Sequence, residues 1–421
     1  MQINPSPLCG EIAAIPSKSD AHRAIICALL SRSVCKISPI IHSDDIMATI
    51  SAAVACGAKC TVDGSILTVD STDIIKSGEH TQIDCNESGS TMRFMLAAAA
   101  ALGANADFDG SGRLPQRPIT DFCELFPAHG AALSSNHLPT TLSGALTCGE
   151  YKISGSISSQ FITGLLLALP ILPGDSRITL TTRLESKPYV DLTLSVMRKF
   201  GVVATEDEHG YVIPGNRQYN CDSYTVEGDW SQAAFFLAAG AIGGDIAMSG
   251  LQLDSVQGDK RIFDIIKQFG GNIYESGGKI ISQKGSLCGI DVDASQIPDL
   301  VPIIAVLAAN AKGTTRIYGA RRLRYKESDR IKTVIAALKA FGVDVTEHDD
   351  GMEITGKPNY VMESDVDCAN DHRIAMAFAV MAAYGSAANV GELLGHYCVR
   401  KSYPDFFDDF AKLQKGVTSN D

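Results

Sequence analysis

Several features that would place this chain in a familiar class are scarce or missing. No segment approaches the roughly 18–20 apolar residues that a membrane span needs, and residues 1–8 lack the basic and apolar regions of a signal peptide. The twelve cysteines include no C-x-x-C pair and the nine histidines are dispersed, so neither a disulfide scaffold nor a metal site is predicted. The net charge of −12 argues against a broad basic surface. We therefore expect a cytoplasmic protein with reduced thiols, no metal, and no nucleic-acid or membrane partner.

Two common catalytic signatures are also missing. The sequence has no G-x-x-x-x-G-K-[ST] motif, so nothing in it indicates binding of a nucleoside triphosphate. It has no G-x-S-x-G motif and no cysteine–histidine signature, so nothing indicates acyl transfer.

What the chain does contain is an internal repeat of about 70 residues. Amphipathic helical segments end at glycines 57, 130, 201, 270 and 342, which are spaced by 73, 71, 69 and 72 residues. Each glycine stands where a left-handed residue is expected after a helix, and a strand follows. A sixth such helix is expected over 404–413.

Between these segments lies a second series of helices that are apolar nearly all round, which predicts burial on most sides. Its six members are expected at 23–30, 92–102, 161–169, 232–241, 300–309 and 372–383. Six units of this size predict two domains of three units, divided near 226–229. Buried helices with sheets around them indicate an α/β fold that is neither a doubly wound sheet nor a TIM barrel.

The N-termini of the buried helices carry an unusual charge pattern. A capping residue precedes each of them, which is typical of helix starts. However, Arg23, Arg93 and Arg373 are expected in or beside the first turn, where the helix dipole disfavours cations. A bound phosphate or carboxylate at each N-terminus would explain this placement.

The stretch Leu323–Lys332 adds a fourth basic cluster. Arg324, Lys326 and Arg330 surround Glu327 at the start of a predicted helix, with Ser328 or Asp329 as its N-cap. Taken alone, the stretch is more typical of a solvated run of charges than of a site. Together with the other helix N-termini, it predicts an anion site to which Lys326, Glu327 and Arg330 contribute, while Arg324 and Lys332 belong to the surface.

Ten short motifs occur in an order that resembles a known family. They are Ser17-Lys18-Ser19 with Arg23, 89–93 (Gly-Ser-Thr-Met-Arg), 116–119 (Gln-Arg-Pro-Ile), 158–161 (Ser-Ser-Gln-Phe), 186–189 (Ser-Lys-Pro-Tyr), 226–229 (Val-Glu-Gly-Asp), 297–299 (Ile-Pro-Asp), 326–330 (Lys-Glu-Ser-Asp-Arg), 370–373 (Asn-Asp-His-Arg) and 401–404 (Lys-Ser-Tyr-Pro). Over essentially its whole length the chain resembles the 5-enolpyruvylshikimate-3-phosphate (EPSP) synthase family. Any one of these motifs is moderately specific, and ten in order are very specific.

The resemblance implies an α/β fold of two domains, each an inside-out α/β barrel of three βαβαββ units with buried helices and outer sheets. It places the N-terminal domain, on the shikimate 3-phosphate side, at 14–226. The catalytic C-terminal domain comprises 1–13 and 227–421, and the cleft lies between the two domains.

The resemblance also implies an activity. The family transfers the enolpyruvyl group of phosphoenolpyruvate to the 5-hydroxyl of shikimate 3-phosphate, on the route to chorismate and the aromatic amino acids. The reaction is an addition followed by an elimination through a tetrahedral intermediate, and it uses no cofactor. Glyphosate is the inhibitor to expect, and we expect a monomer.

Site residues follow by position within the matching motifs. The resemblance assigns shikimate 3-phosphate binding to Lys18, Ser19, Arg23, Ser158, Ser159, Gln160, Ser186, Tyr189, Asp299 and Lys326. It assigns phosphoenolpyruvate binding to Lys18, Gly89, Arg93, Arg117, Gln160, Arg330, Arg373 and Lys401. It implies that Asp299 or Lys326 handles the 5-hydroxyl proton, that Glu327 donates a proton to carbon, and that Lys18 and His372 assist.

The chain departs from the family pattern at Glu87, Phe94 and Arg322, which bears on glyphosate affinity rather than on the reaction. One alternative is the sister transferase that acts on UDP-N-acetylglucosamine, whose signature has Lys-Asn in place of Lys18-Ser19. Another is an inactive homologue that binds phosphorylated metabolites, which would be expected to lack Asp299 or Glu327.

Overall fold

The computed structural model describes residues 1–386 and 388–415, and the chain divides into two compact units. The amino unit is Pro16–Val226. The carboxy unit combines Met1–Ile15 with Glu227–Asp421. The chain therefore passes from one unit to the other twice, after Ile15 and after Val226.

Six helices have almost every side chain buried, as their apolar sequences predict. They are α1 (Lys18–Leu30), α3 (Gly89–Leu102), α5 (Ser159–Ala168), α7 (Trp230–Gly243), α9 (Val301–Ala309) and α11 (His372–Ala383). Helices α1 and α3 begin earlier than predicted, because the polar residues of their first turns also adopt helical conformation. Consequently Arg23 and Arg93 lie in the second turn, beside the first, and Arg373 lies in the first turn of α11, which agrees with the predicted positions in or beside the first turn.

A second set of helices is amphipathic: α2 (Asp44–Ala55), α4 (Thr120–Leu125), α6 (Lys187–Lys199), α8 (Ile262–Phe269), α10 (Arg330–Ala340) and α12 (Phe406–Lys415). The predicted glycines follow five of them, with α4 reaching its glycine through a short 3₁₀ turn. Their φ angles are 93°, 87°, 79°, 94° and 65° at residues 57, 130, 201, 270 and 342. The predicted left-handed helix endings are therefore confirmed.

The strands form five four-stranded sheets and one two-stranded sheet in the described part of the chain. The strands of the amino unit are β2 (Val34–Ser38), β3 (Lys59–Asp63), β4 (Ile66–Asp70), β5 (His80–Asp84), β6 (Asn105–Asp109), β7 (Ala131–Leu133), β8 (Thr140–Gly144), β9 (Glu150–Ile153), β10 (Ser176–Leu180), β11 (Thr205–Asp207), β12 (Gly210–Ile213) and β13 (Ser223–Thr225). The strands of the carboxy unit are β1 (Cys9–Ala13), β14 (Asp245–Ser249), β15 (Asn272–Ser276), β16 (Lys279–Gln283), β17 (Asp291–Asp293), β18 (Thr314–Tyr318), β19 (Asp344–His348), β20 (Gly351–Thr355), β21 (Val366–Asp367) and β22 (Leu393–Leu394).

All five four-stranded sheets share one pairing scheme. In the order β5-β6-β8-β7, the first pair is parallel and the next two are antiparallel. The same holds for β9-β10-β12-β11, β13-β2-β4-β3, β1-β14-β16-β15 and β17-β18-β20-β19. The sixth sheet, β21-β22, is a single parallel pair.

Two of these parallel pairs join segments that are distant in sequence. Strand β1 is followed by α1 but pairs with β14, in register from Cys9↔Asp245 to Ala13↔Ser249. Strand β13 is followed by α7 but pairs with β2. In the amino unit the last strand thus pairs with the first, and in the carboxy unit β1 pairs with the first strand of the segment that begins at Glu227.

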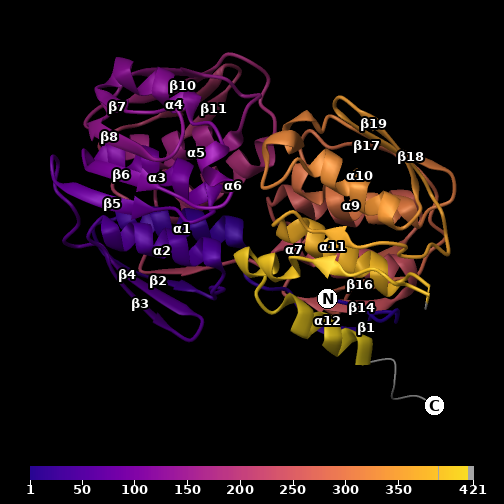
Figure 1. Cartoon of the computed structure of the whole chain (residues 1–421). Coiled ribbons are helices and arrows are strands. Elements are labelled where there is room, and N and C mark those ends of the chain that lie inside the picture. The colour runs from indigo at the N-terminus through magenta and orange to yellow at the C-terminus, as the bar shows by residue number, and fades with distance from the viewer. Residues whose placement is uncertain (387, 416–421) are drawn as a thin grey trace. The chain divides into compact units, whose positions relative to one another are not determined.

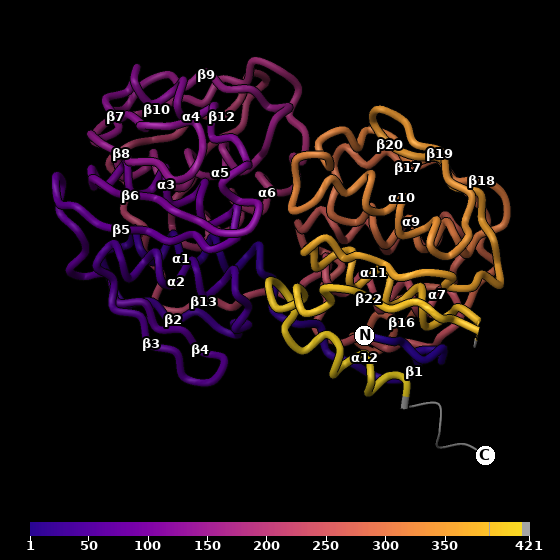
Figure 2. Tube along the Cα trace, viewed as in Figure 1, coloured from indigo at the N-terminus to yellow at the C-terminus, as the bar shows by residue number. Residues whose placement is uncertain are grey.

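Within the amino unit, the strands lie outside α1, α3 and α5, which contact one another (Figures 1 and 2). Helices α3 and α5 approach each other very closely at Gly164. A Cβ atom there would lie 2.7 Å from the carbonyl oxygen of Arg93. Only glycine allows this approach, which brings the N-terminal turns of the two helices together. Among the described residues, no helix is both long enough and apolar enough to cross a membrane.

Candidate active site

In the amino unit, the start of α1 carries a tight ion pair. Ser17 caps the helix by accepting a hydrogen bond from the Asp20 amide, and Lys18 follows as the first helical residue. The Lys18 Nζ lies 2.5 Å from Oδ2 of Asp45, at the start of α2, with both side chains largely buried. Asp45 was not among the predicted site residues, although the acidic run after Ser43, at a helix start, was a signal for it.

Arg23 joins α1 to α6. Its Nε donates to Thr193 Oγ1 at 2.8 Å, its Nη1 to the Ser19 carbonyl at 2.6 Å, and its Nη2 to the Tyr189 carbonyl at 2.9 Å. Burial lowers the pKa of this guanidinium to about 10, with nearby Asp20 opposing the shift, so it remains charged at neutral pH. The structure thus brings three predicted site residues, Ser19, Arg23 and Tyr189, into one cluster.

A second cluster joins α3 to α5. The Arg93 Nη1 donates to Gln160 Oε1 at 2.7 Å, and the Gln160 Nε2 donates to Ser90 Oγ at 2.9 Å. The guanidinium of Arg117 lies against Gly89, since a Cβ atom there would be 2.6 Å from its Nη1. Glycine at residue 89 therefore lets Arg117 lie against the N-terminus of α3.

Besides Ser19, the other three serines assigned to the amino unit stand at helix starts. Ser158 is the N-cap of α5 and accepts from the Gln160 amide, and Ser159 is the first residue of that helix. Ser186 precedes α6 with a φ of 55°, a left-handed conformation that is costly for a residue with a side chain. This strained conformation at a buried serine is typical of functional positions.

In the carboxy unit, Arg330 holds three carboxylates together. Its Nε donates to Asp371 Oδ2 at 2.7 Å, its Nη1 to Asp299 Oδ1 at 2.8 Å, and its Nη2 to Glu327 Oε2 at 2.7 Å. Only 1% of the Arg330 side chain is exposed, and Asp371 is fully buried. Of the three cations predicted around Glu327, Arg330 contacts it, Lys326 contacts Asp299, and Arg324 pairs with Glu347 and Asp329.

Asp299 is contacted by three cations. Besides Arg330, it accepts hydrogen bonds from Arg373 Nη2 at 3.0 Å and from Lys326 Nζ at 3.4 Å. Burial alone would raise the pKa of Asp299, but Arg373, Lys326 and Arg330 outweigh that effect and hold it well below its usual range. Asp299 is therefore ionised at neutral pH.

The prediction that Asp299 caps a buried helix was wrong. It lies in the 3₁₀ turn Pro298–Leu300, and α9 begins after that turn at Val301 without a side-chain cap. The reason is that its carboxylate oxygens already accept from Lys326, Arg330 and Arg373.

Around the start of α11, Asp371 has two tasks. It caps the helix by accepting from the Arg373 amide at 3.0 Å, and it receives both Arg330 and the Ser328 hydroxyl. His372 is the first helical residue and is buried. The buried Lys401 Nζ donates to the Asn370 carbonyl at 2.7 Å, so this predicted residue lies beside the same N-terminus.

The flanks of the 323–332 stretch show mixed outcomes. Asp329 caps α10, and of the two predicted caps, Ser328 and Asp329, it is therefore the second that is confirmed. Lys332 is exposed, as predicted. Arg324, predicted at the surface, is 22% exposed and pairs with Glu347 at 2.9 Å. The Arg322 Nη2 donates to the Ser295 carbonyl at 2.8 Å.

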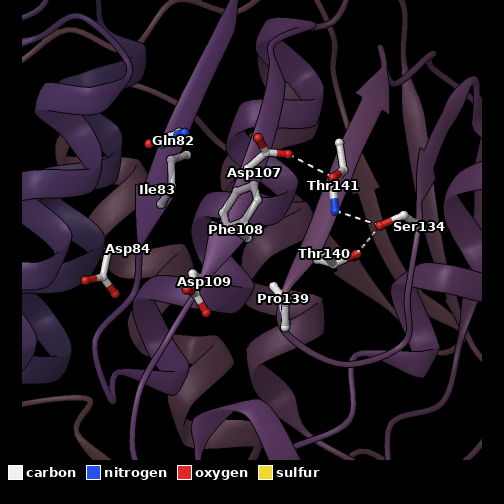
Figure 3. A pocket seen from close by; sticks show the side chains of 10 residues that line it. All are labelled: Gln82, Ile83, Asp84, Asp107, Phe108, Asp109, Ser134, Pro139, Thr140 and Thr141. Atoms are coloured by element: carbon white, nitrogen blue, oxygen red, sulfur yellow. Dashed lines mark hydrogen bonds between the residues drawn. The ribbon is translucent and has the colours of Figure 1, made fainter.

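A groove of about 470 Å³ on the sheet of β5, β6 and β8 contains none of the predicted site residues (Figure 3). Among its lining residues are Asp84, Asp107 and Asp109, and Asp107 accepts from the Thr141 hydroxyl at 2.8 Å. In 1–386 and 388–415, no three His, Cys, Asp or Glu side chains form a group that could hold a metal ion.

Comparison with known proteins gives a consistent result along the whole chain. Residues 3–410 match the family model of EPSP synthase (3-phosphoshikimate 1-carboxyvinyltransferase). The chain is 43% identical to the 3-phosphoshikimate 1-carboxyvinyltransferase of Clostridium novyi (strain NT) and 42% identical to that of Clostridium beijerinckii, covering 98% of this chain and 97% of the relative in both cases.

Solved structures share the fold. The EPSP synthase of Acinetobacter baumannii matches with a TM-score of 0.78 at 24% identity, over 98% of this chain and 97% of that one. The enolpyruvyl transferase NikO from Streptomyces tendae matches with a TM-score of 0.79 at 18% identity, over 98% and 96%.

Proposed function

The chain belongs to the EPSP synthase (3-phosphoshikimate 1-carboxyvinyltransferase) family, and from this we propose that it transfers the enolpyruvyl group of phosphoenolpyruvate to the 5-hydroxyl of shikimate 3-phosphate. The products are 5-enolpyruvylshikimate 3-phosphate and inorganic phosphate. The observation that carries the assignment to these residues is that Arg330 touches both Asp299 and Glu327, at 2.8 and 2.7 Å. One buried guanidinium thus holds the proposed base and the proposed acid side by side.

Each unit, in this proposal, is an inside-out α/β barrel of three βαβαββ repeats. Two observations support it: one pairing scheme recurs in five sheets, and six buried helices alternate with six amphipathic ones among the described residues. The domain at 14–226 would serve shikimate 3-phosphate, and the domain of 1–13 and 227–421 would supply the catalytic carboxylates.

Shikimate 3-phosphate has a phosphate and a carboxylate, which call for cations and hydroxyl donors. In the amino unit we assign this role to Lys18, Ser19, Arg23, Ser158, Ser159, Gln160, Ser186 and Tyr189. Backbone N–H groups at the starts of α1 and α5 are donors of the kind that bind phosphate. Asp299 and Lys326 of the carboxy unit would contact the 5-hydroxyl.

Phosphoenolpyruvate likewise carries a phosphate and a carboxylate. We assign its binding to Lys18, Gly89, Arg93, Arg117, Gln160, Arg330, Arg373 and Lys401. Each hydrogen bond to a charged group contributes about 1.5–3 kcal/mol, so a set of this size can offset the desolvation of both anions. The guanidinium of Arg93 contacts the neutral Gln160, and that of Arg330 contacts the acidic Glu327. A bound anion would have to share or replace these partners.

The chemistry needs one group that takes a proton and one that gives a proton. Ionised Asp299, with Lys326 at 3.4 Å, would receive the 5-hydroxyl proton while the oxygen bonds to C2 of phosphoenolpyruvate. Glu327 would protonate C3 in the same addition. Anions bound near Arg330 and Arg373 would favour the protonated form of Glu327 that donation requires.

The elimination then reverses the proton movement at carbon. A proton leaves C3, the C2–O bond to phosphate breaks, and the enol double bond forms again, so atoms and charge balance without a cofactor. We assign assistance in these proton transfers to His372 and Lys18. For partners and location, we propose glyphosate as an inhibitor, a monomer, and the cytoplasm; the absence of disulfides among the twelve cysteines supports the last.

The decisive experiment follows phosphate release from phosphoenolpyruvate by the purified protein. Release is expected with shikimate 3-phosphate and not without it, and not with UDP-N-acetylglucosamine as acceptor. Asp299→Asn serves as the matched control, since it keeps the side-chain shape and removes the charge. Release without shikimate 3-phosphate, or none with it, would overturn the assignment.

A further inference from the structure

A buried histidine beside Lys18 has no part in the proposed chemistry. His22 lies one helical turn after Lys18 in α1, and its side chain is almost completely buried. Its Nδ1 is 2.7 Å from Oγ1 of Thr49, in α2. Its Nε2 is buried without a hydrogen-bond partner among the described residues.

His22 and Lys18 form two parallel links between the same helices. Lys18 pairs with Asp45 at 2.5 Å, and His22 meets Thr49 at 2.7 Å. Lys18 and His22 are four residues apart on α1, and Asp45 and Thr49 are four residues apart on α2. Each pair therefore lies on one face of its helix. The link at His22 therefore fixes how α2 is placed along α1, and with it where Asp45 stands relative to Lys18.

The same link continues into a third helix. The Thr49 and Thr91 hydroxyl oxygens are 2.6 Å apart, and Thr91 Oγ1 donates to Ser88 Oγ at 2.7 Å. Ser88 is the N-cap of α3, the helix that carries Gly89 and Arg93. A continuous series of hydrogen bonds thus runs from His22 to the start of α3.

The direction of these hydrogen bonds determines the tautomer of the histidine. Each threonine hydroxyl has one proton. Thr91 gives its proton to Ser88, so only the proton of Thr49 can lie between the two threonine oxygens, which are 2.6 Å apart. Thr49 therefore accepts from His22, which places the proton on Nδ1 and leaves a bare lone pair on Nε2.

We propose that His22 is a positioning residue for Lys18: its Nδ1–H anchors α2 through Thr49, so that Asp45 holds the Lys18 ammonium in place for the anionic substrate. This inference rests on the substrate-binding role proposed for Lys18. It requires a neutral imidazole in its Nδ1–H form.

The surroundings of His22 keep it neutral. Burial lowers its pKa well below the usual value, and the positive charges of Lys18 and Arg23 lower it further. A second proton, on Nε2, would have no acceptor among the described residues. It would also make the ring a third cation, beside Lys18 and Arg23, within six residues of α1.

Two amides distinguish the roles of the two ring nitrogens. In His22→Asn, the amide nitrogen can occupy the place of Nδ1 and still donate to Thr49. In His22→Gln, the amide reaches toward the place of Nε2 and the donor to Thr49 is lost. The pair has equal charge and similar polarity, so a difference between them isolates the hydrogen bond at Nδ1.

The first test is spectroscopic and does not depend on activity. Long-range ¹H–¹⁵N spectra of protein with labelled histidines should show the Nδ1–H tautomer for His22, identified by the signal that disappears in His22→Asn. Thr49→Val should alter this signal. An Nε2–H tautomer or an imidazolium at neutral pH would overturn the inference even if the enzyme has the proposed activity.

The second test is kinetic. A lost buried hydrogen bond corresponds to roughly a tenfold effect, so His22→Gln and Thr49→Val should raise KM for phosphoenolpyruvate about tenfold with kcat less affected. His22→Asn should stay within about threefold of the wild type. His80→Gln, at an exposed histidine that contacts Asp107, is the control and should change neither constant.

Equal effects of His22→Asn and His22→Gln would overturn the inference, as would an effect on kcat alone. If instead the wild type releases no phosphate from the two substrates, the proposed function fails, whereas the tautomer result still decides the hydrogen-bond arrangement. The two failures are therefore distinguishable.

Discussion

Replacing Arg330 with methionine tests the structure where its charges are most concentrated. Methionine fills a similar volume and removes the five N–H donors of the guanidinium. The change leaves Asp371, Asp299 and Glu327 without their shared cation.

The size of the effect follows from what each carboxylate retains. Asp299 keeps Lys326 and Arg373, and Glu327 is partly exposed to water. Asp371 is fully buried, and the donors that remain to it are neutral, such as the Ser328 hydroxyl at 3.0 Å. Removing one partner of a buried pair costs about 3–5 kcal/mol, and Asp371 brings this site into that range. We expect a loss of about 4 kcal/mol, a large part of the roughly 5–15 kcal/mol of a typical fold.

A single fluorophore reports on the unit in question. Trp230 is the only tryptophan of the chain; it begins α7 in the carboxy unit, is fully buried, and donates from Nε1 to the Gln252 carbonyl. Urea unfolding followed by tryptophan fluorescence therefore measures the stability of the unit that contains Arg330. The midpoint should fall while the dependence on urea concentration stays the same.

Arg324→Met is the matched control in the same stretch. Its guanidinium pairs with Glu347, which is 40% exposed, and exposed pairs contribute about 0.2–1 kcal/mol. The double variant Arg330→Met, Asp371→Asn should recover part of the loss, because the unpaired buried charge is gone. A free energy of unfolding for Arg330→Met within about 1 kcal/mol of the wild type would refute the reasoning.

Two further predictions concern turnover and pH. Glu327→Gln should leave shikimate 3-phosphate binding, measured by calorimetry, nearly intact and lower turnover at least about a hundredfold; near-normal turnover would remove Glu327 as the proton donor. Burial, and then the charge of Asp299, raise the pKa of Asp259 to about 6, so its protonated form is favoured in the fold. Its stabilising contribution is complete below the unfolded pKa of about 3.9 and is lost as pH rises through about 6. Asp259→Asn should flatten the stability profile in that window by on the order of 2–3 kcal/mol in urea titrations; an unchanged slope would contradict this.

Local features of the fold could be predicted well from the chain. The buried helices, the glycines that end the amphipathic ones, and caps such as Asp329 depend on residues within a few positions of one another. Even there, the cap of α9 was predicted wrongly, because Asp299 contacts three distant cations instead of capping its own helix.

The pairing of charges could not be predicted in the same way. A cation near a helix start predicts that an anion lies nearby, but the sequence does not say which anion. Lys18 pairs with a carboxylate 27 residues away, and Arg330 with one 41 residues away. The acidic run that contains Asp45 and the helix cap Asp371 can both be read from the sequence. That they are the partners of Lys18 and Arg330 follows only from the packing of the helices.

By itself, the sequence determined the repeated unit, the identity of the buried helices and, through its ordered motifs, the family. These follow from periodicity and from local backbone preferences, which act over one or two helical turns. Only the tertiary structure decided that β1 pairs with β14, that one arginine holds three carboxylates, and that a buried histidine contacts Thr49. Such contacts depend on distances of a few ångströms between remote segments, and packing alone sets those distances.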